Sequence, residues 1–193
     1  MNTFECIKNR NSYRGKYKYE IIPKADLIKI MDAGLSAPSG CNKQTTSLIA
    51  IDDKETLRKV LDVIEPKVCD TAPALICVLS ENIYAYRDKC YAIQDYSAAI
   101  ENMLLEIVEL GYSSCWIEGH ITDTDRICDK IAKILDVPSN YNLVCILPIG
   151  HAIDEVKKPN KKDFNKRSCF NNFKNMEKWL WIWMLFIKQK MLM

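Results

Sequence analysis

Residues 92–111 of this chain read AIQDYSAAIENMLLEIVELG, and no other stretch of the sequence is as strongly periodic. Apolar side chains recur there at three- and four-residue spacing, which predicts a helix over residues 92–110 that ends at Gly111. The periodic positions are Ile93, Tyr96, Ile100, Met103, Leu104 and Ile107. Further apolar residues occupy its other faces, so we expect a helix enclosed on most sides, in part by a second subunit.

Shorter patterns on both sides of this helix predict an alternation of strands and helices. Strands are expected at residues 47–51, 74–79, 113–117 and 143–149, and the second of them is apolar throughout, as in a strand buried on both faces. Helices are expected at residues 3–8, 23–34, 54–64 and from Thr122 or Asp123 to about Leu135. Pro23 lies near the start of its helix and Gly34 just past its end.

Length and composition narrow the class of protein. A chain of 193 residues with 48% hydrophobic residues suits one globular domain. Lys+Arg 27 against Asp+Glu 25 gives a net charge of +2 without a basic block, which disfavours nucleic acid as a partner. Nine cysteines, several of them within apolar runs, and a polar start without a signal peptide predict a reducing, cytoplasmic location. The sequence has no Cys-x-x-Cys pair and only two histidines, so we expect no metal site.

The composition changes toward the C-terminus. From Lys157 the chain becomes basic and irregular, and residues 179–187 form an apolar run of nine rich in tryptophan. A membrane span needs about 20 such residues, so no transmembrane span is expected. Three interpretations of this run remain open: it is a packing segment, an interfacial anchor or a non-native extension.

The segment Arg10-Asn11-Ser12-Tyr13-Arg14 places two guanidinium groups around a hydroxyl. Arginine presents a planar fork of donors that matches phosphate oxygens, and alternate residues of an extended segment point to the same side. The chain has 6 glycines and none of the usual glycine-rich phosphate loops, so phosphate would have to be held by side chains. Lys161 and Lys162 are further candidates for that role. A solvated basic loop is the alternative interpretation of each group on its own.

Four elements in order resemble the FMN-dependent nitroreductase family. They are Arg10-x-Ser12-x-Arg14, then Ala37-Pro38-Ser39-x-x-Asn42-x-Gln44, then the long helix with Glu109-Leu110-Gly111-Tyr112 and Trp116-Ile117-Glu118-Gly119, and finally Pro148-Ile149-Gly150-His151. The resemblance runs from about Cys6 to about Lys166. It implies an α+β fold of three layers, in which a central, mostly antiparallel sheet is flanked by helices and the long helix lies at a homodimer interface. The implied domain covers residues 1–166, and residues 167–193 form a C-terminal extension that is dimer-wrapping or irregular.

The resemblance also implies a cofactor, FMN, and the residues that hold it. Arg10 with Lys161 or Lys162 would bind the phosphate, Arg14 would lie near the flavin ring, and the Glu118-Gly119 backbone would lie opposite the flavin N5 atom. The loop from Pro38 would come from the partner subunit. The full set of implied FMN-binding residues is Arg10, Asn11, Ser12, Arg14, Pro38, Ser39, Gly40, Asn42, Gln44, Glu118, Gly119, Lys161 and Lys162.

The implied activity is a ping-pong oxidoreduction from NADH or NADPH through FMN to a nitroaromatic, quinone or other electrophilic acceptor. No protein nucleophile or metal is needed, because the flavin carries the chemistry. Three alternatives remain. One is a protein that binds or senses flavin without turnover, and another is a specialised relative such as a reductive dehalogenase or a flavin-modifying enzyme. The third is a thiol hydrolase built on Cys115, Glu118 and His120, although the spacing of Cys115 and His120 does not by itself bring them together.

Overall fold

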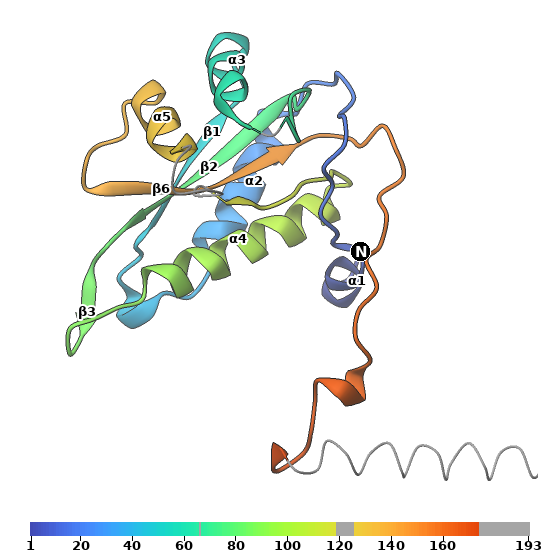
Figure 1. Cartoon of the computed structure of the whole chain (residues 1–193), viewed down its shortest axis with the longest axis vertical. Helices are drawn as coiled ribbons and strands as arrows, with labels where there is room; N and C mark the ends of the chain where they lie inside the picture. The colour runs from blue at the N-terminus through green and yellow to red at the C-terminus, as the bar shows by residue number, and fades with distance from the viewer. Residues whose placement is uncertain (66, 119–125, 174–193) are drawn as a thin grey trace, which may run out of the picture. The chain divides into compact units, whose positions relative to one another are not determined.

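The computed structural model of the chain describes residues 1–65, 67–118 and 126–173 (Figure 1). The chain divides into two compact units, one spanning Met1–Lys157 and the other beginning at Lys158. The predicted domain boundary at residue 166 stays a prediction. Among the described residues, no helix combines the length and apolar character needed to cross a membrane. The tryptophan-rich run predicted at residues 179–187 lies outside the described part of the chain.

A four-stranded sheet forms the centre of the first unit. Its strands are β1 (Thr46–Ile51), β2 (Ala74–Glu81), β6 (Tyr141–Ile149) and β5 (Ile117–Glu118), in that spatial order. All three pairings are antiparallel, with Leu48 opposite Val78, Cys77 opposite Ile146, and Ile146 opposite Ile117. The expected mostly antiparallel sheet is therefore confirmed.

Strand β2 is buried on both faces, as its uninterrupted apolar sequence predicted. Leu75, Cys77 and Leu79 contribute to one hydrophobic cluster, whereas Ala74, Ile76 and Val78 contribute to a second cluster across the sheet. Side chains of a strand alternate between its two faces, so a wholly apolar strand requires a helical layer on each side.

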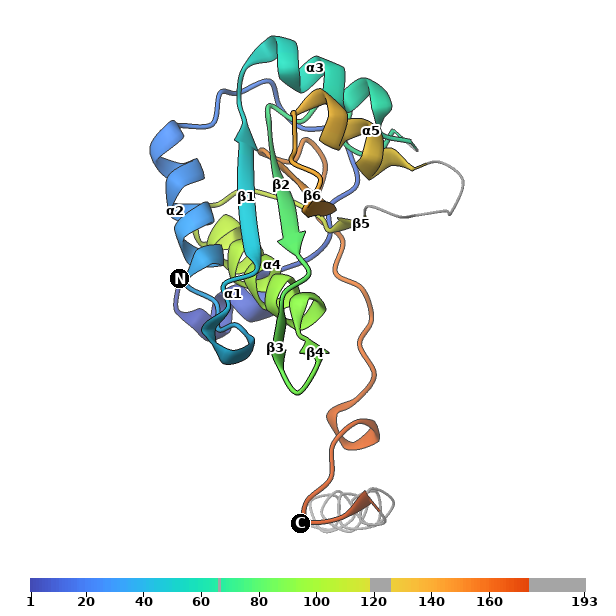
Figure 2. The same cartoon turned by 90° about the vertical axis from the view of Figure 1, so that its left-hand side faces the viewer.

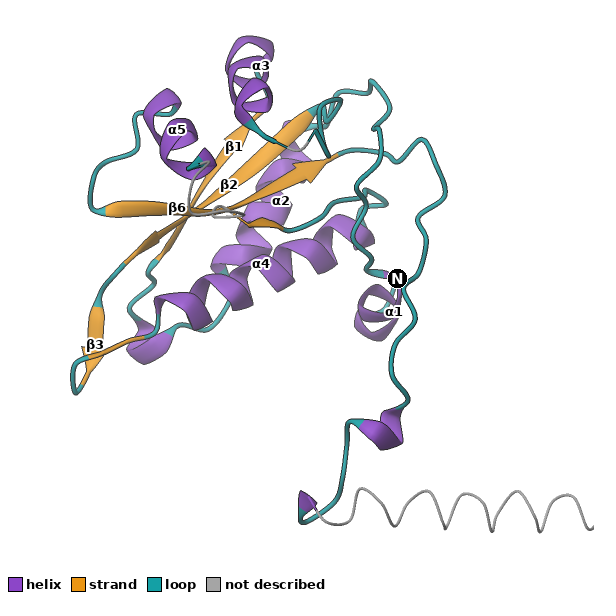
Figure 3. Ribbon diagram, viewed as in Figure 1, coloured by secondary structure: helices purple, strands orange, loops and turns teal. Residues whose placement is uncertain are grey.

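Helices supply these two layers (Figures 1 and 2). On one face lie α2 (Lys24–Leu35) and α4 (Ala92–Glu109), and on the other lie α3 (Lys54–Val63) and α5 (Ile127–Ile134). A short helix, α1 (Thr3–Asn9), packs beside α4. The three-layer arrangement of helices around strands is visible in Figure 3 and agrees with the expected α+β class.

The long helix α4 matches its predicted bounds to within one residue. Ile100, Met103 and Ile107 are buried against the sheet and α2, as their spacing predicted. Ile93 is different, because 66% of it is exposed within the single chain. Enclosure of α4 by a second subunit stays a prediction.

Most boundaries lie within two residues of those expected, and three differences stand out. Gly34 lies inside α2 rather than past its end, because an added Cβ there would come within 2.7 Å of Met103 Cγ on α4, so glycine serves helix packing. The strand predicted at residues 113–117 pairs regularly only at Ile117–Glu118, since Ser113 and Ser114 form isolated bridges with two different segments. Helix α5 begins at Ile127, later than predicted, and the expected caps Thr122 and Asp123 lie outside the described residues.

Four short elements were not predicted. Strands β3 (Tyr84–Tyr86) and β4 (Lys89–Cys90) form a hairpin between β2 and α4, and η1 (Gly40–Asn42) is a single turn before β1. Another single turn, η2 (Phe164–Lys166), lies in the second unit. Elements this short carry too few residues for a periodic pattern to reveal.

Candidate functional site

The segment after α1 is held by main-chain contacts and by one buried ring. Ser12 bridges Ser114 in parallel, and the Tyr13 N–H donates to the Ser114 carbonyl over 2.9 Å. Tyr13 is buried, and its hydroxyl donates to the Lys16 carbonyl and accepts the Ile153 N–H. With Tyr13 turned inward, Ser12 and Arg14 on either side of it are exposed, as alternation in an extended segment predicts.

The two arginines of this segment differ in their surroundings. Arg10 follows the last turn of α1, and its Nε lies 3.5 Å from Glu101 Oε1 on α4. Arg14 is exposed and lies near Cys115. Burial raises the pKa of the Cys115 thiol to about 11, and the Arg14 charge acts in the opposite direction. Arg10 is thus tied to α4, while Arg14 remains open to solvent.

The loop from Ser39 to Gln44, containing η1, is fastened to the first turn of α4 by a buried carboxylate. Asp95 accepts the Gly40 N–H at 2.7 Å with one oxygen and the Thr45 hydroxyl at 2.8 Å with the other. An added Cβ at Gly40 would lie 2.6 Å from Tyr91, so only glycine allows this approach. Asp95 itself is 4% exposed. The loop backbone is therefore anchored at a fixed place beside α4.

The loop itself adopts an unusual backbone. Cys41, Asn42 and Gln44 have φ values of 52°, 53° and 51°, in the left-handed region that few residues other than glycine enter. Ser39 supports this shape, because its hydroxyl oxygen accepts the Gln44 N–H at 2.9 Å. The side chains of Asn42 and Gln44 are exposed, as is Pro38, so the loop presents its predicted residues to solvent.

Glu118 ends the short strand β5 and is exposed. Its carboxylate accepts the indole N–H of Trp116 at 2.8 Å. Burial, followed by the nearby Glu118 charge, raises the pKa of Tyr96 on α4. Glu118 thus lies close to both aromatic side chains. Gly119, predicted beside it, lies outside the described residues.

The residues Ser113–Glu118, called here the edge strip, connect two parts of the predicted site. At one end Ser114 holds the Arg10–Arg14 segment, and at the other end lies Glu118. Ser114 lines a pocket of about 170 Å³ together with Arg10 and Asn11. Its buried hydroxyl has no hydrogen-bond partner among the described residues. A donor is therefore left beside the arginine segment for a group that the protein itself does not supply.

The lysines predicted to help bind the phosphate lie in the second unit of the chain. Lys161 and Lys162 are both exposed there, and their role stays a prediction. Among the described residues, no group of three or more His, Cys, Asp or Glu side chains is arranged to hold a metal.

Two residues that organise the site were missed by sequence reasoning, namely Asp95 and Tyr13. Asp95 had a detectable signal, because it is a carboxylate within the apolar stripe of α4, between Ala92 and Ala99. A charge at such a position needs buried partners. Tyr13 had a weaker signal. Its place between two polar residues indicates only that its side chain faces inward, and does not reveal its hydrogen-bond partners.

The chain is similar to known proteins over most of its length. The family model described as Nitroreductase family matches residues 7–68 and 61–151. A relative from Archaeoglobus fulgidus, provisionally named an NADH dehydrogenase/NAD(P)H nitroreductase, is 30% identical over 155 residues, which cover 78% of this chain and 87% of the relative. The chain therefore belongs to the nitroreductase family.

Two solved structures share the fold. An FMN-dependent nitroreductase from Clostridium difficile has a TM-score of 0.75 and 32% identity, and the match covers 88% of this chain and 99% of that one. A nitroreductase with bound FMN from Bacteroides fragilis has a TM-score of 0.71 and 26% identity, with 89% and 100% covered. The resemblance inferred from four short motifs is confirmed.

Proposed function

We propose that this protein is an FMN-dependent oxidoreductase that passes electrons from NADH or NADPH to a nitroaromatic, quinone or other electrophilic acceptor. Bound FMN supplies the hydride chemistry, while the protein supplies binding, orientation and charge. Membership of the nitroreductase family and the neighbours whose names include FMN support this proposal.

The observation that carries the proposal is the edge strip. It runs from Ser114, which bridges the Arg10–Arg14 segment, through three residues to Glu118, and extended chain spans at most about 3.3–3.6 Å per residue. The arginine segment and Glu118 are thus separated by at most about 14 Å along one strip. A ligand with a phosphate at one end and a flat ring at the other suits this spacing.

Each end has residues suited to its part of the cofactor. Arg10, Asn11 and Ser12 would bind the phosphate, with the unpartnered Ser114 hydroxyl nearby. Arg14 would place a positive charge near the ring, which favours its reduced, negatively charged form. The Glu118-Gly119 backbone would meet the ring edge.

The remaining residues require a second copy of the chain. Pro38, Ser39, Gly40, Asn42 and Gln44 would contact the flavin bound by the partner subunit. An exposed apolar residue on α4, Ile93, supports such a homodimer, as do half-buried Ala98 and Leu105 on the same helix. Sedimentation of the protein should report a dimer, and Ile93→Asp should shift it toward the monomer.

The first test of the cofactor is the colour of the purified protein. It should be yellow, or become yellow on addition of FMN, and its visible bands should bleach anaerobically with NADH or NADPH. A colourless protein that does not take up FMN contradicts the proposal. Binding without bleaching by either nicotinamide would instead favour a flavin-binding protein without turnover.

The second test addresses the phosphate contact. Arg10→Ala should weaken FMN binding by about 2 kcal/mol, roughly thirtyfold, because it removes a charge-assisted contact. Lys18→Ala is the matched control, since it removes one positive charge from an exposed position of the same N-terminal segment. Equal affinities of the two variants, measured by fluorescence titration, would show that Arg10 does not bind the phosphate.

The thiol-hydrolase alternative is disfavoured by the state of its nucleophile. Cys115 is 1% exposed, and burial raises the pKa of its thiol to about 11, which keeps the reactive thiolate scarce. His120 lies outside the described residues. A hydrolase would require activity that survives flavin removal and is lost in Cys115→Ser.

A further inference from the structure

The two units of the chain carry net charges of opposite sign. Residues 1–157 have 18 Lys+Arg against 23 Asp+Glu, a formal net charge of −5, whereas residues 158–193 have 9 against 2, a net charge of +7. Such an asymmetry within one chain indicates that the basic part meets a nucleic acid or a membrane. The proposed flavin site takes up at most two of these basic residues, Lys161 and Lys162.

The described part of the second unit, residues 158–173, presents its basic side chains to solvent. Lys161, Lys162, Lys166 and Arg167 are all exposed. Asp163 is the single acidic residue of this stretch, and its Oδ2 lies 3.7 Å from Lys166 Nζ in an exposed ion pair. Positive charge therefore dominates the surface of these residues.

Large aromatic side chains are exposed among these charges. Phe164 is 71% exposed, Phe170 57% and Phe173 75%, all within ten residues of sequence. No side chain of residues 158–173 is buried, so this stretch has no core of its own to receive them. A single exposed apolar residue is ordinary, but three phenylalanines so close together in a basic stretch indicate a contact surface.

The same combination continues along the sequence. Three of the chain's 4 tryptophans lie in the apolar run at residues 179–187, which Lys178 and Lys188 flank. Nine residues are too few to cross a bilayer, which needs about 20, and tryptophan beside lysine is typical of the boundary between membrane and water. A nucleic acid offers no apolar layer for the leucine, isoleucine and methionine of this run. The composition therefore favours a membrane surface.

We propose that residues 158–193, called here the basic unit, bind the surface of an anionic lipid bilayer. The phenylalanine and tryptophan side chains enter the headgroup region, and the lysine and arginine side chains face the lipid phosphates. Burial of apolar side chains and attraction to anionic headgroups act together in such binding. The proposal needs no segment that crosses the bilayer, and it does not depend on the proposed cofactor.

Co-sedimentation with vesicles tests this proposal on the full chain. Vesicles made of equal parts phosphatidylcholine and phosphatidylglycerol should carry the protein into the pellet, and vesicles of pure phosphatidylcholine should bind it about tenfold more weakly. Because the Debye length shortens from about 10 Å at 0.1 M salt to about 3 Å at 1 M, high salt should reduce binding to the anionic vesicles. Absence of binding to the anionic vesicles, or equal binding to both kinds, overturns the proposal.

Matched charge variants locate the contact. Lys166→Gln combined with Arg167→Gln should weaken binding to the anionic vesicles about twentyfold, because each basic residue near such a surface contributes about fivefold. Neither residue belongs to the proposed flavin site. Lys54→Gln combined with Lys133→Gln removes the same charge from exposed positions of the first unit and should leave binding unchanged. Equal losses in the two double variants would show that the basic unit is not the contact.

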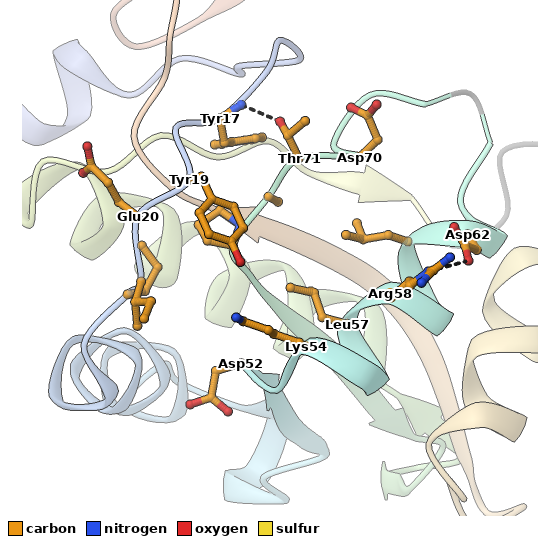
Figure 4. Close-up of a pocket in the computed structure, with 15 residues that line it drawn as sticks. Tyr17, Tyr19, Glu20, Asp52, Lys54, Leu57, Arg58, Asp62, Asp70 and Thr71 are labelled. Carbon is orange, nitrogen blue, oxygen red and sulfur yellow. Dashed lines mark hydrogen bonds and ion pairs between the residues drawn. The ribbon is translucent and has the colours of Figure 1, made fainter.

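Aromatic variants test the apolar part of the contact. Phe164→Ser combined with Phe173→Ser should weaken vesicle binding about tenfold, because two rings lose their burial. Tyr19→Ser is the control, since its ring is 84% exposed in the first unit, at the rim of the pocket drawn in Figure 4. Retention of full binding by the double phenylalanine variant overturns the proposal. So does displacement of the wild-type protein from the vesicles by single-stranded RNA, which would assign the basic unit to nucleic acid.

Discussion

The Arg10–Arg14 segment and the Ser39–Gln44 loop both present exposed predicted residues, but they are held in different ways. The first shares its support among a strand-like bridge, a main-chain hydrogen bond and the buried Tyr13. The second depends largely on Asp95, which holds both Gly40 and Thr45. Distributed support tolerates the loss of one contact, whereas concentrated support does not.

The sharpest test of this difference is Asp95→Ala. It leaves the Gly40 N–H and the Thr45 hydroxyl without their acceptor in a buried place, so the free energy of unfolding should fall by about 3 kcal/mol. Urea denaturation measures the loss. Asp95→Asn keeps one acceptor oxygen and should recover part of it, while a loss below about 1 kcal/mol for Asp95→Ala would mean that the loop is held by other contacts.

Tyr13→Phe should cost less, about 1–2 kcal/mol. It removes the hydroxyl that joins Lys16 and Ile153, but the ring stays buried and the Tyr13 main-chain hydrogen bond remains. Urea denaturation again provides the measurement, with Tyr19→Phe as a control at an exposed ring. A loss equal to that of Asp95→Ala would erase the contrast between the two segments.

The sequence predicted the exposed residues of both segments better than their supports. Arginine, serine and the loop residues from Pro38 stand out because their chemistry suits an anion or a turn, and their order matched a family pattern. The role of Asp95 depends on which distant main-chain groups meet it, and no spacing within residues 92–110 encodes the position of Gly40 or Thr45.

Secondary structure was likewise predicted well where it depends on local composition and poorly where it depends on distant neighbours. The uninterrupted apolar run of β2 and the three- and four-residue spacing of α4 predicted their elements because burial dictates composition directly. Gly34 misled the prediction, since a glycine that ends a helix and one that admits a neighbouring helix look alike in sequence. The roles of Gly34 and Asp95 depend on which residues lie next to them in the folded chain, and residue type alone does not reveal those neighbours.

Backbone strain in the Ser39–Gln44 loop provides a test in which a substitution should raise the free energy of unfolding instead of lowering it. Cys41 has a φ of 52°, which glycine adopts at little cost, so Cys41→Gly should stabilise the protein by about 0.5–1 kcal/mol. Lys43→Gly is the control, because its φ of −75° is ordinary and glycine there only adds unfolded-state freedom. If both variants destabilise equally in urea, the loop is not strained at Cys41.

The smallest change in stability should come from the loss of a hydrogen bond to Asp26, a carboxylate that is only partly buried. Tyr112, just before the edge strip, donates to Asp26 Oδ2 on α2 at 2.9 Å. This hydrogen bond, followed by that from Lys29, lowers the pKa of Asp26 below its ordinary value of 3.8. A carboxyl with a lowered pKa contributes stability above its unfolded-state pKa, and that contribution is lost as the pH falls through the folded-state pKa.

Tyr112→Phe should therefore lower the urea midpoint slightly at neutral pH, and the gap from the wild type should close as the pH falls below 3.8. Asp26→Asn in the same background separates charge from hydrogen bonding, because it should make the effect of Tyr112→Phe nearly independent of pH. A gap that stays constant under acid in the wild-type background would mean that Tyr112 acts through packing alone. The edge strip would then be joined to α2 by a buried ring, in the same way that Tyr13 holds the Arg10–Arg14 segment. A carboxylate would not be its main support, in contrast to the Ser39–Gln44 loop, which Asp95 holds.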